Sequence, residues 1–422
     1  MMNTIIIIIF IIGYTAIAFE SKIKINKAAS ALITGVLCWT IYIFSASDVH
    51  AINENLLIHL GDIASILFFL LGAMVIVELI GAHDGFSIIT NRIRTHKKSK
   101  LLIIITIITF FLSAVLDNLT TAIVMISLVR KILNEKEDRW YFGGMIIIAA
   151  NAGGAWSPLG DVTTTMLWIG GQVSAYNIMF KLILPSLICC FFPTFILWLK
   201  YRGKTFEMPL TIKVSEIPVK EQNLVFFIGI TGLLFVPVFK TLTHLPPFMG
   251  MMLALAMIWA AISIIHRSKD KEIRKNYSVD TALQKADSPS ILFFLGILIA
   301  VSALQSVGIL KFLADFLTEN LKHDASIGIV LGLLSSVIDN VPLVAAAIGM
   351  YDLNTYPMDH FFWELLAFTT GTGGSAIIIG SAAGIAVMGI EKISFFWYLK
   401  KISWIALLGF FSGTLFYILL YN

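Results

Sequence analysis

The sequence predicts an all-α polytopic membrane protein built from two inverted repeats, and three observations support this fold class. The chain has 422 residues, of which 58% are hydrophobic and only 13% charged, whereas soluble proteins average about 25% charged residues. Its apolar runs are long and continuous, which is typical of membrane helices and not of the alternating strands of a membrane barrel. An Asp-Asn pair inside an apolar stretch occurs twice, at residues 117–118 and 339–340.

The first three apolar runs, near 3–19, 28–44 and 62–81, are long enough to cross a membrane as helices. The segments after the first and third runs are basic, most strongly at 92–100, and the segment after the second is not. Because basic loops face the cytoplasm, this pattern predicts that the first helix starts outside. An Ala-x-Ala pattern at 16–18 resembles a signal-peptide cleavage site, but no Lys or Arg precedes the apolar run, which favours an uncleaved first helix.

Residues 101–129 break this alternation, because basic residues flank the apolar stretch on both sides. The stretch holds 29 residues, which is too few for two crossings of about 20 residues each. We therefore expect a re-entrant hairpin with Asp117 and Asn118 at its tip, near the middle of the membrane. Irregular backbone at that depth is tolerated only inside protein or beside water.

A broken helix is expected next, at 141–169. Its segment from Asn151 to Asp161 contains three glycines and Pro158, which interrupt a helix and free backbone carbonyls. Later apolar runs bring the expected total to about ten full spans. They lie near 176–199, 223–239, 247–265, 289–307, 360–388 and 402–421.

The second half of the chain repeats three landmarks of the first in the same order, at offsets of 220 to 225 residues. They are the apolar motif at 66–72 and 291–296, the Asp-Asn pair, and a Gly-Gly pair followed by a third glycine, starting at 153 and 373. The repeat predicts a second hairpin at 325–349 and a second broken helix at 360–388. The flanks of the second hairpin are not basic, so we expect it to enter from outside and the repeats to be inverted.

The expected domain organisation follows from these landmarks. It comprises N-terminal scaffold helices at 1–60, a first repeat at 61–200, cytoplasmic links and scaffold helices at 201–288, and a second repeat with a final helix at 289–422. Inverted repeats whose broken helices meet near the midplane are a transporter architecture.

Polar residues at the helix interruptions predict a cation site. A charged group at membrane depth is costly and is therefore a functional candidate. Hard cations prefer carboxylate, amide and hydroxyl oxygens, and the first repeat supplies all three kinds. The candidates are Asp117, Asn118, Asn151, Asp161, Thr163 and Thr164. Neighbouring buried carboxylates bind a proton or a metal ion, and binding both at once costs free energy. Asp117 and Asp161 are therefore also candidates for carrying the proton.

Structural explanations compete with this interpretation. Asp117 and Asp161 could simply cap helices, and the threonines could bond back to helical carbonyls. The structural explanation is stronger for Asp339, because Pro342 stands where the first repeat has Thr120. The second repeat therefore offers fewer ligands, and its candidates are Ser335, Asp339, Asn340 and Ser375. Glu78, deep in the third span, either relays protons or pairs with a cytoplasmic base.

The motifs around these residues resemble the NhaD-type sodium/proton antiporters of the ion transporter superfamily. The resemblance covers nearly the whole chain and rests on the segments 113–121, 151–164 and 335–340. It implies a scaffold domain, a mobile transport domain, elevator-like alternating access and a homodimer. It also implies exchange of cytoplasmic Na⁺ and Li⁺ for external H⁺ across a bacterial inner membrane, in pH and sodium homeostasis.

The resemblance also carries functional roles onto matching positions of this chain. The residues concerned are Asp117, Asn118, Asn151, Asp161, Thr163, Thr164, Ser335, Asn340 and Glu78.

Two other functions fit parts of the pattern. A di- or tricarboxylate or oxyanion transporter on the same fold would use neutral Ser, Asn and Thr at its hairpin tips, where carboxylates would repel the substrate. A channel does not require inverted broken repeats, and no metalloprotease, nucleophile-elbow or P-loop pattern indicates an enzyme. We expect no cofactor and no nucleic-acid partner, and the three cysteines are expected only to pack.

Overall fold

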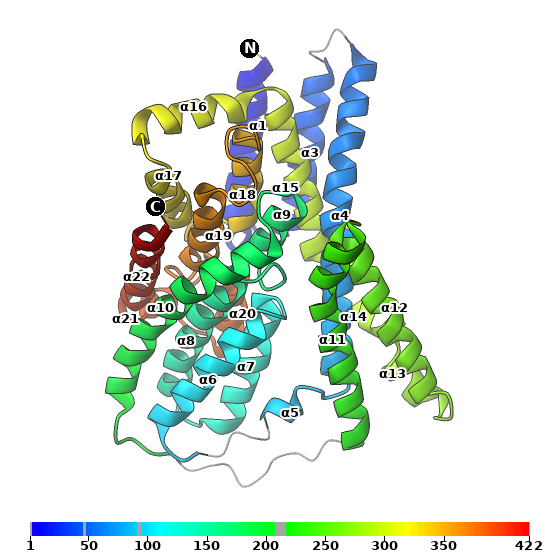
Figure 1. Cartoon of the computed structure of the whole chain (residues 1–422), viewed down its shortest axis with the longest axis vertical. Helices are drawn as coiled ribbons and strands as arrows, with labels where there is room; N and C mark the ends of the chain where they lie inside the picture. The colour runs from blue at the N-terminus through cyan, green and yellow to red at the C-terminus, as the bar shows by residue number, and fades with distance from the viewer. Residues whose placement is uncertain (1, 45–47, 91–94, 207–216, 422) are drawn as a thin grey trace.

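The protein is described by a computed structural model that covers residues 2–44, 48–90, 95–206 and 217–421. Nearly all of these residues are helical (Figure 1). One isolated antiparallel bridge joins Lys97 to Thr205. Arg92 and Arg94, which belong to the predicted cytoplasmic basic segment, lie outside the described residues.

Seven helices in the described ranges are long and apolar enough to cross a membrane. They are α3 (Lys27–Phe44), α4 (Val49–Ala82), α10 (Ala175–Tyr201), α11 (Val219–Thr243), α12 (Pro247–Ile265), α15 (Ser288–Ser306) and α22 (Ser403–Tyr421). An eighth span results if α20 (Ala382–Glu391) and α21 (Phe395–Lys401), which meet at a bend of 115°, are counted together. This is fewer than the ten spans predicted, because α1 (Met2–Ala18) is short and the remaining apolar runs are divided into shorter or more polar helices.

Helix α4 begins earlier than the third span that the apolar pattern predicts near residue 62. The helix contains 34 residues, and Asp48 caps its N-terminus by accepting hydrogen bonds from the backbone N–H groups of His50 and Ala51. Such a cap starts a helix in a polar segment that precedes the apolar run. At 1.5 Å per residue the helix is about 51 Å long, whereas the hydrocarbon core of a bilayer is about 30 Å thick.

Each half of the chain contains two pairs of consecutive helices, and a short break separates the two helices of each pair. In the first half α6 (Lys98–Ser113) is followed by α7 (Asn118–Ile132), and α8 (Lys136–Ala155) by α9 (Val162–Ile169). In the second half α17 (Asp324–Leu334) is followed by α18 (Asn340–Met350), and α19 (Phe361–Gly373) by α20. We call residues 114–118 the first tip and residues 335–340 the second tip.

Matching glycines make the same close backbone contact in both halves. A Cβ atom on Gly153 of α8 would lie 2.2 Å from the carbonyl oxygen of Phe110 in α6. A Cβ atom on Gly373 of α19 would lie 2.0 Å from the carbonyl oxygen of Gly332 in α17. Only glycine therefore lets each broken helix approach its neighbouring arm this closely.

Matching serines support these contacts. The Ser113 hydroxyl donates a hydrogen bond to the carbonyl oxygen of Ala150 at 2.7 Å, and the Ser335 hydroxyl donates to that of Thr370 at 3.1 Å. Each bond ties the end of one helix, α6 or α17, to the helix packed beside it, α8 or α19.

The core of the molecule lies where α8 and α19 pack against each other. Every residue of 141–155 in α8 and of 362–373 in α19 is buried. A helix that is apolar or small on all sides belongs in such a position. Farther out, α3 packs along α15, and a Cβ atom on Gly296 would lie 2.4 Å from the backbone nitrogen of Leu32.

Shorter helices fill segments for which the sequence predicts no span. They are α2 (Glu20–Ile23), α5 (Ser87–Thr90), α13 (Lys271–Asn276), α14 (Val279–Lys285) and α16 (Ile309–Leu321). Helix α16 lies across the top of the molecule in Figure 1, and its Phe312 and Phe316 side chains are exposed.

Candidate functional site

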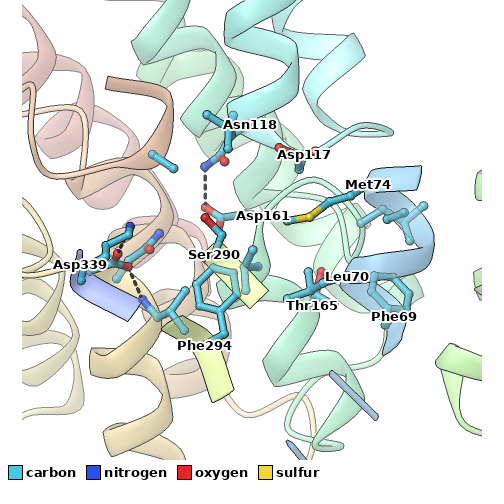
Figure 2. A pocket seen from close by; sticks show the side chains of 18 residues that line it. Phe69, Leu70, Met74, Asp117, Asn118, Asp161, Thr165, Ser290, Phe294 and Asp339 are labelled. Carbon is cyan, nitrogen blue, oxygen red and sulfur yellow. Dashed lines mark hydrogen bonds and ion pairs between the residues drawn. The ribbon is translucent and has the colours of Figure 1, made fainter. Parts of the chain in front are cut away.

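The first turns of α7, α9, α18 and α20 line one cavity with a volume of about 60 Å³ (Figure 2). Residues of α3, α4 and α15 complete its lining. A side chain caps each of the four helix N-termini, and these caps are Asp117, Asp161, Asp339 and Ser381. Segments that are far apart in the sequence thus bring their capping side chains to one cavity.

Asp117 is held firmly by the turn that it caps. Its Oδ1 atom accepts a hydrogen bond from the Thr120 backbone N–H at 2.8 Å, and its Oδ2 atom accepts one from the Thr120 hydroxyl at 2.6 Å. The cap explanation for Asp117 therefore describes the observed geometry. It does not exclude ion binding, because each carboxylate oxygen has a further lone pair.

Asp161 is the more deeply buried of these two carboxylates, with 2% of its surface exposed. Its Oδ1 atom accepts a hydrogen bond from the Thr163 backbone N–H at 3.1 Å, and its Oδ2 atom lies 3.4 Å from the Asn118 amide nitrogen, which donates to it. A Cβ atom on Gly371 of α19 would lie 3.4 Å from the same Oδ2 atom. The carboxylate thus sits between the first tip and the second broken helix.

Asn151 connects the two halves beside this carboxylate. Its side-chain oxygen accepts a hydrogen bond from the Asn118 amide at 3.1 Å. Its own amide nitrogen donates to the hydroxyls of Ser375 at 2.9 Å and Ser381 at 3.0 Å. Asn151 is fully buried, and its amide group has partners from both halves of the chain, while its side-chain oxygen keeps a second lone pair.

Three buried threonine hydroxyls near the site have no hydrogen-bond partner within the part of the chain that the structure describes. They belong to Thr121, Thr163 and Thr164. The alternative in which Thr163 and Thr164 bond back to helical carbonyls is therefore not what the geometry shows. Each of these hydroxyl oxygens keeps its lone pairs, but none of the three residues is among those that line the cavity.

The second tip presents a different arrangement. The Oδ1 atom of Asp339 accepts a hydrogen bond from the Val341 backbone N–H at 3.2 Å, and its Oδ2 atom lies 4.0 Å from the Nζ atom of Lys27. Asn340 is buried and lines the cavity. Ser335 does not line it, because its hydroxyl is directed to backbone carbonyls of α17 and α19.

Glu78 is also outside the cavity lining. Its Oε1 atom lies 3.8 Å from the Nζ atom of Lys285 in α14, and its side chain is 35% exposed. Glu78 thus lies near a basic side chain, as one of its two explanations expects.

The sequence reasoning overlooked Lys27, Thr165 and Ser290 as residues of the cavity. Lys27 directly precedes the predicted second span, and we read it only as part of a basic loop that indicates topology. Its proximity to Asp339, more than 300 residues later in the chain, has no local sequence signal.

Charged groups of both signs surround the cavity. Three carboxylates line it against one ammonium group, that of Lys27. Each helix N-terminus adds a partial positive charge of about +0.5, and the aspartate caps supply the negative charge that a bare N-terminus would attract from an anion. No group of three or more His, Cys, Asp or Glu side chains that could share one metal ion occurs among the described residues, so a bound cation would use neutral oxygens as well.

Comparison with known proteins points to transporters. Residues 5–373 match the family described as citrate transporter. Sodium/proton antiporters 1 and 2 of Arabidopsis thaliana are 45% and 44% identical to this chain over 98% of its length, and the match covers 72% and 99% of those proteins. The Na(+)/H(+) antiporter NhaD of Alkalimonas amylolytica is 30% identical over 93% of this chain and 86% of its own.

Among solved structures, the YdaH transporter of Alcanivorax borkumensis has a similar fold. The TM-score is 0.58 at 12% sequence identity, and the superposition covers 89% of each chain. At this identity the likeness concerns the fold alone.

Proposed function

We propose a function for this chain from its family and its relatives. The chain belongs to the citrate-transporter family, and its relatives include NhaD-type sodium/proton antiporters. The predicted resemblance to NhaD-type antiporters is confirmed by these relatives. The chain is accordingly a multi-pass membrane transporter. Its proposed activity is secondary active exchange of cytoplasmic Na⁺ for external H⁺.

The observation that carries this proposal is the set of carboxylate caps around the cavity. Asp117 and Asp161 place two negative charges at helix N-termini in the first half, and unpartnered threonine hydroxyls lie beside them. A sodium ion prefers such oxygen ligands. The proposed partners of Asp117 in holding the ion are Asn118, Asn151, Asp161, Thr163 and Thr164, and the secondary candidates are Asp339, Asn340 and Ser375.

Competition within this cavity would couple the two ions. A carboxylate that carries a proton is a weaker ligand for a cation, and a bound cation disfavours protonation by the same coupling free energy. Asp117 and Asp161 are the proposed proton carriers and act as one coupled system. Glu78 is a weaker candidate because it pairs with Lys285.

The proposed transport cycle uses inverted repeats and elevator-like alternating access. The repeated glycine and serine contacts of the two halves support the repeat. The flanks of the first hairpin are basic and those of the second are not, which supports the inversion. The domain organisation set out from the sequence belongs to this proposal. Li⁺ as a second cation, a homodimer and a bacterial inner membrane as the location also belong to this proposal, as what the motif resemblance to NhaD-type antiporters implies.

The test is dissipation of a pH gradient in inside-out membrane vesicles that contain the protein. We expect Na⁺ and Li⁺ to dissipate the gradient and K⁺ to do so less, with no response in vesicles that contain the Asp161→Asn variant. The absence of any response to Na⁺ in the wild-type protein would contradict the proposal.

A carboxylate transporter is the second candidate, because the family description names citrate and four helix N-termini surround the cavity. Three carboxylates in the same cavity would repel a di- or tricarboxylate. Succinate and citrate in the same vesicle experiment decide between the two, since only a carboxylate transporter would respond to them.

A further inference from the structure

Lys27 is the only basic residue among those that line the described cavity. It is the first residue of α3, and its Nζ atom lies 4.0 Å from the Asp339 Oδ2 atom. The same atom lies 4.5 Å from the centroid of the buried Phe293 ring of α15, a cation–π geometry that favours an ammonium ion at this place. The Lys27 and Asp339 side chains are 27% and 33% exposed, so an ion in the cavity can reach this pair.

The second tip lacks the threonine donor of the first tip, and the Lys27 ammonium lies near its aspartate. In the first tip both oxygens of Asp117 accept hydrogen bonds from Thr120. The matching position in the second tip is Pro342, which has neither a hydroxyl nor a backbone N–H. The Oδ2 atom of Asp339 therefore has no donor within its own turn, and the Lys27 ammonium lies 4.0 Å from it.

The ammonium belongs to a part of the molecule different from that of the carboxylate. Helix α3 is packed tightly on α15, and the Trp39 indole donates a hydrogen bond to the carbonyl oxygen of Ile299 at 2.9 Å. Asp339, by contrast, caps α18 of the second hairpin. Tyr14 of α1 also approaches the backbone of Asp339, so α1 and α3 together contact the second tip.

We propose that Lys27 is a tethered competitor of the transported cation. Its ammonium pairs with the Asp339 carboxylate when no sodium ion is bound. A sodium ion can bind this carboxylate only when the Lys27 side chain moves away from it. One carboxylate cannot neutralise two monovalent cations, so the two compete without any change in the protonation of Lys27. Lys27 thereby lowers the affinity for sodium and links the contact between α3 and the second tip to the occupancy of the cavity.

This inference rests on the proposed sodium exchange, and its test measures the apparent KM for Na⁺ in vesicles at fixed pH. Replacement of the competitor in Lys27→Met should lower this KM about five-fold, the effect of losing about 1 kcal/mol from a partly exposed ion pair. Lys27→Gln should do the same, and Lys27→Arg, which keeps the charge, should stay near the wild-type value. Lys24→Met is the matched control, because Lys24 is an exposed lysine just before the same helix.

The Asp339→Asn background shows whether the effect passes through the ion pair. There Lys27→Met should change the apparent KM less than two-fold, because the partner charge is already gone. An unchanged KM in Lys27→Met and Lys27→Gln while the maximal rate falls would mean a merely structural role and overturns the inference, although sodium exchange stands. An equal KM shift in the Asp339→Asn background also overturns it. Absence of sodium exchange in the wild-type protein overturns both proposals.

Discussion

The first and second tips share a backbone design and differ in their chemistry. In both, an aspartate caps the second arm of a hairpin, and a glycine of the adjacent broken helix touches the first arm. The first tip faces a second carboxylate, Asp161, whereas the matching cap beside the second tip is the neutral Ser381. The packing of the two tips is thus alike, while their polar side chains differ.

This difference shows that two halves with similar packing can carry different polar groups. The first half offers two carboxylates and free threonine hydroxyls, and it is the half that we assign to the cation. The second half offers one carboxylate that faces an ammonium group. Asn151 joins the two halves through Ser375 and Ser381, so a change of ligands in one half is felt by the other.

The largest expected effect comes from removing charge at the first half. Asp161→Asn and Asp117→Asn should each reduce sodium-driven proton exchange to the level of empty vesicles. Asparagine caps helices about as well as aspartate, so folding should survive, as size-exclusion profiles of the purified variants would show. Turnover like that of the wild type in either variant would remove that residue from the ion site.

Next in size are the two matched glycines. Gly153→Ala and Gly373→Ala each force a methyl group to about 2 Å from a carbonyl oxygen, and the resulting backbone shift should cost about 1–3 kcal/mol of stability or more. Thermal unfolding in detergent should show similar losses for both. Gly389→Ala, where nothing lies within 4 Å of the added atom, is the control, and a loss confined to one half would break the structural equivalence.

A milder effect is expected at the second tip. Asp339→Asn should keep exchange measurable and change the apparent KM for Na⁺ by less than about ten-fold, or about 1.4 kcal/mol, because its partner Lys27 is lost as a competitor at the same time. The same vesicle measurement over a range of sodium concentrations checks this. Complete loss of exchange would show that the two tips contribute equally.

A smaller change should follow when the first tip is made to resemble the second. Thr120→Val removes the hydroxyl that donates to the Asp117 Oδ2 atom and keeps the backbone N–H. Loss of one hydrogen bond to a charged group is worth about 1.5–3 kcal/mol, offset in part by water in the cavity, so we expect the apparent KM for Na⁺ to change by several-fold. Thr241→Val, at an exposed helical threonine, is the control. Identical kinetics in Thr120→Val would show that this bond does not tune the first tip.

The last prediction separates the acid response of the cavity from that of another site. Burial lowers the pKa of His83 and of His266, which follow α4 and α12 and whose Nε2 atoms lie 3.0 Å apart. As the pH falls below the ordinary value of about 6.5, the unfolded chain binds protons that the folded pair does not, so stability should fall, by at most about 1.4 kcal/mol per pH unit for each histidine.

Thermal unfolding between pH 8 and 5.5 should therefore show a smaller acid loss in the double variant His83→Gln, His266→Gln than in the wild type. The apparent KM for Na⁺ should rise at acid pH in both proteins, since that rise belongs to the carboxylates of the cavity. A rise that disappears in the double variant would place the proton response at the histidine pair and not at the tips.

The sequence by itself determined the membrane class and where the polar interruptions fall. Long apolar runs have no stable alternative to membrane helices, and glycine, proline and aspartate at 117, 153–161 and 339 act on their own local backbone. For this reason Asp117 and Asp161 could be named in advance. The resemblance to a family, which the relatives confirm, came from the same local motifs.

Only the tertiary structure decided which polar groups share a cavity and which do not. Ser335 was a candidate ligand by motif and Glu78 a candidate proton relay, yet Ser335 bonds to backbone carbonyls and Glu78 lies 3.8 Å from the Nζ atom of Lys285. Lys27 looked like a topology signal, yet it faces Asp339. Hydropathy records the preference of each segment for the bilayer, whereas contacts between residues hundreds of positions apart depend on how the helices pack, and packing leaves no periodic trace in a single sequence.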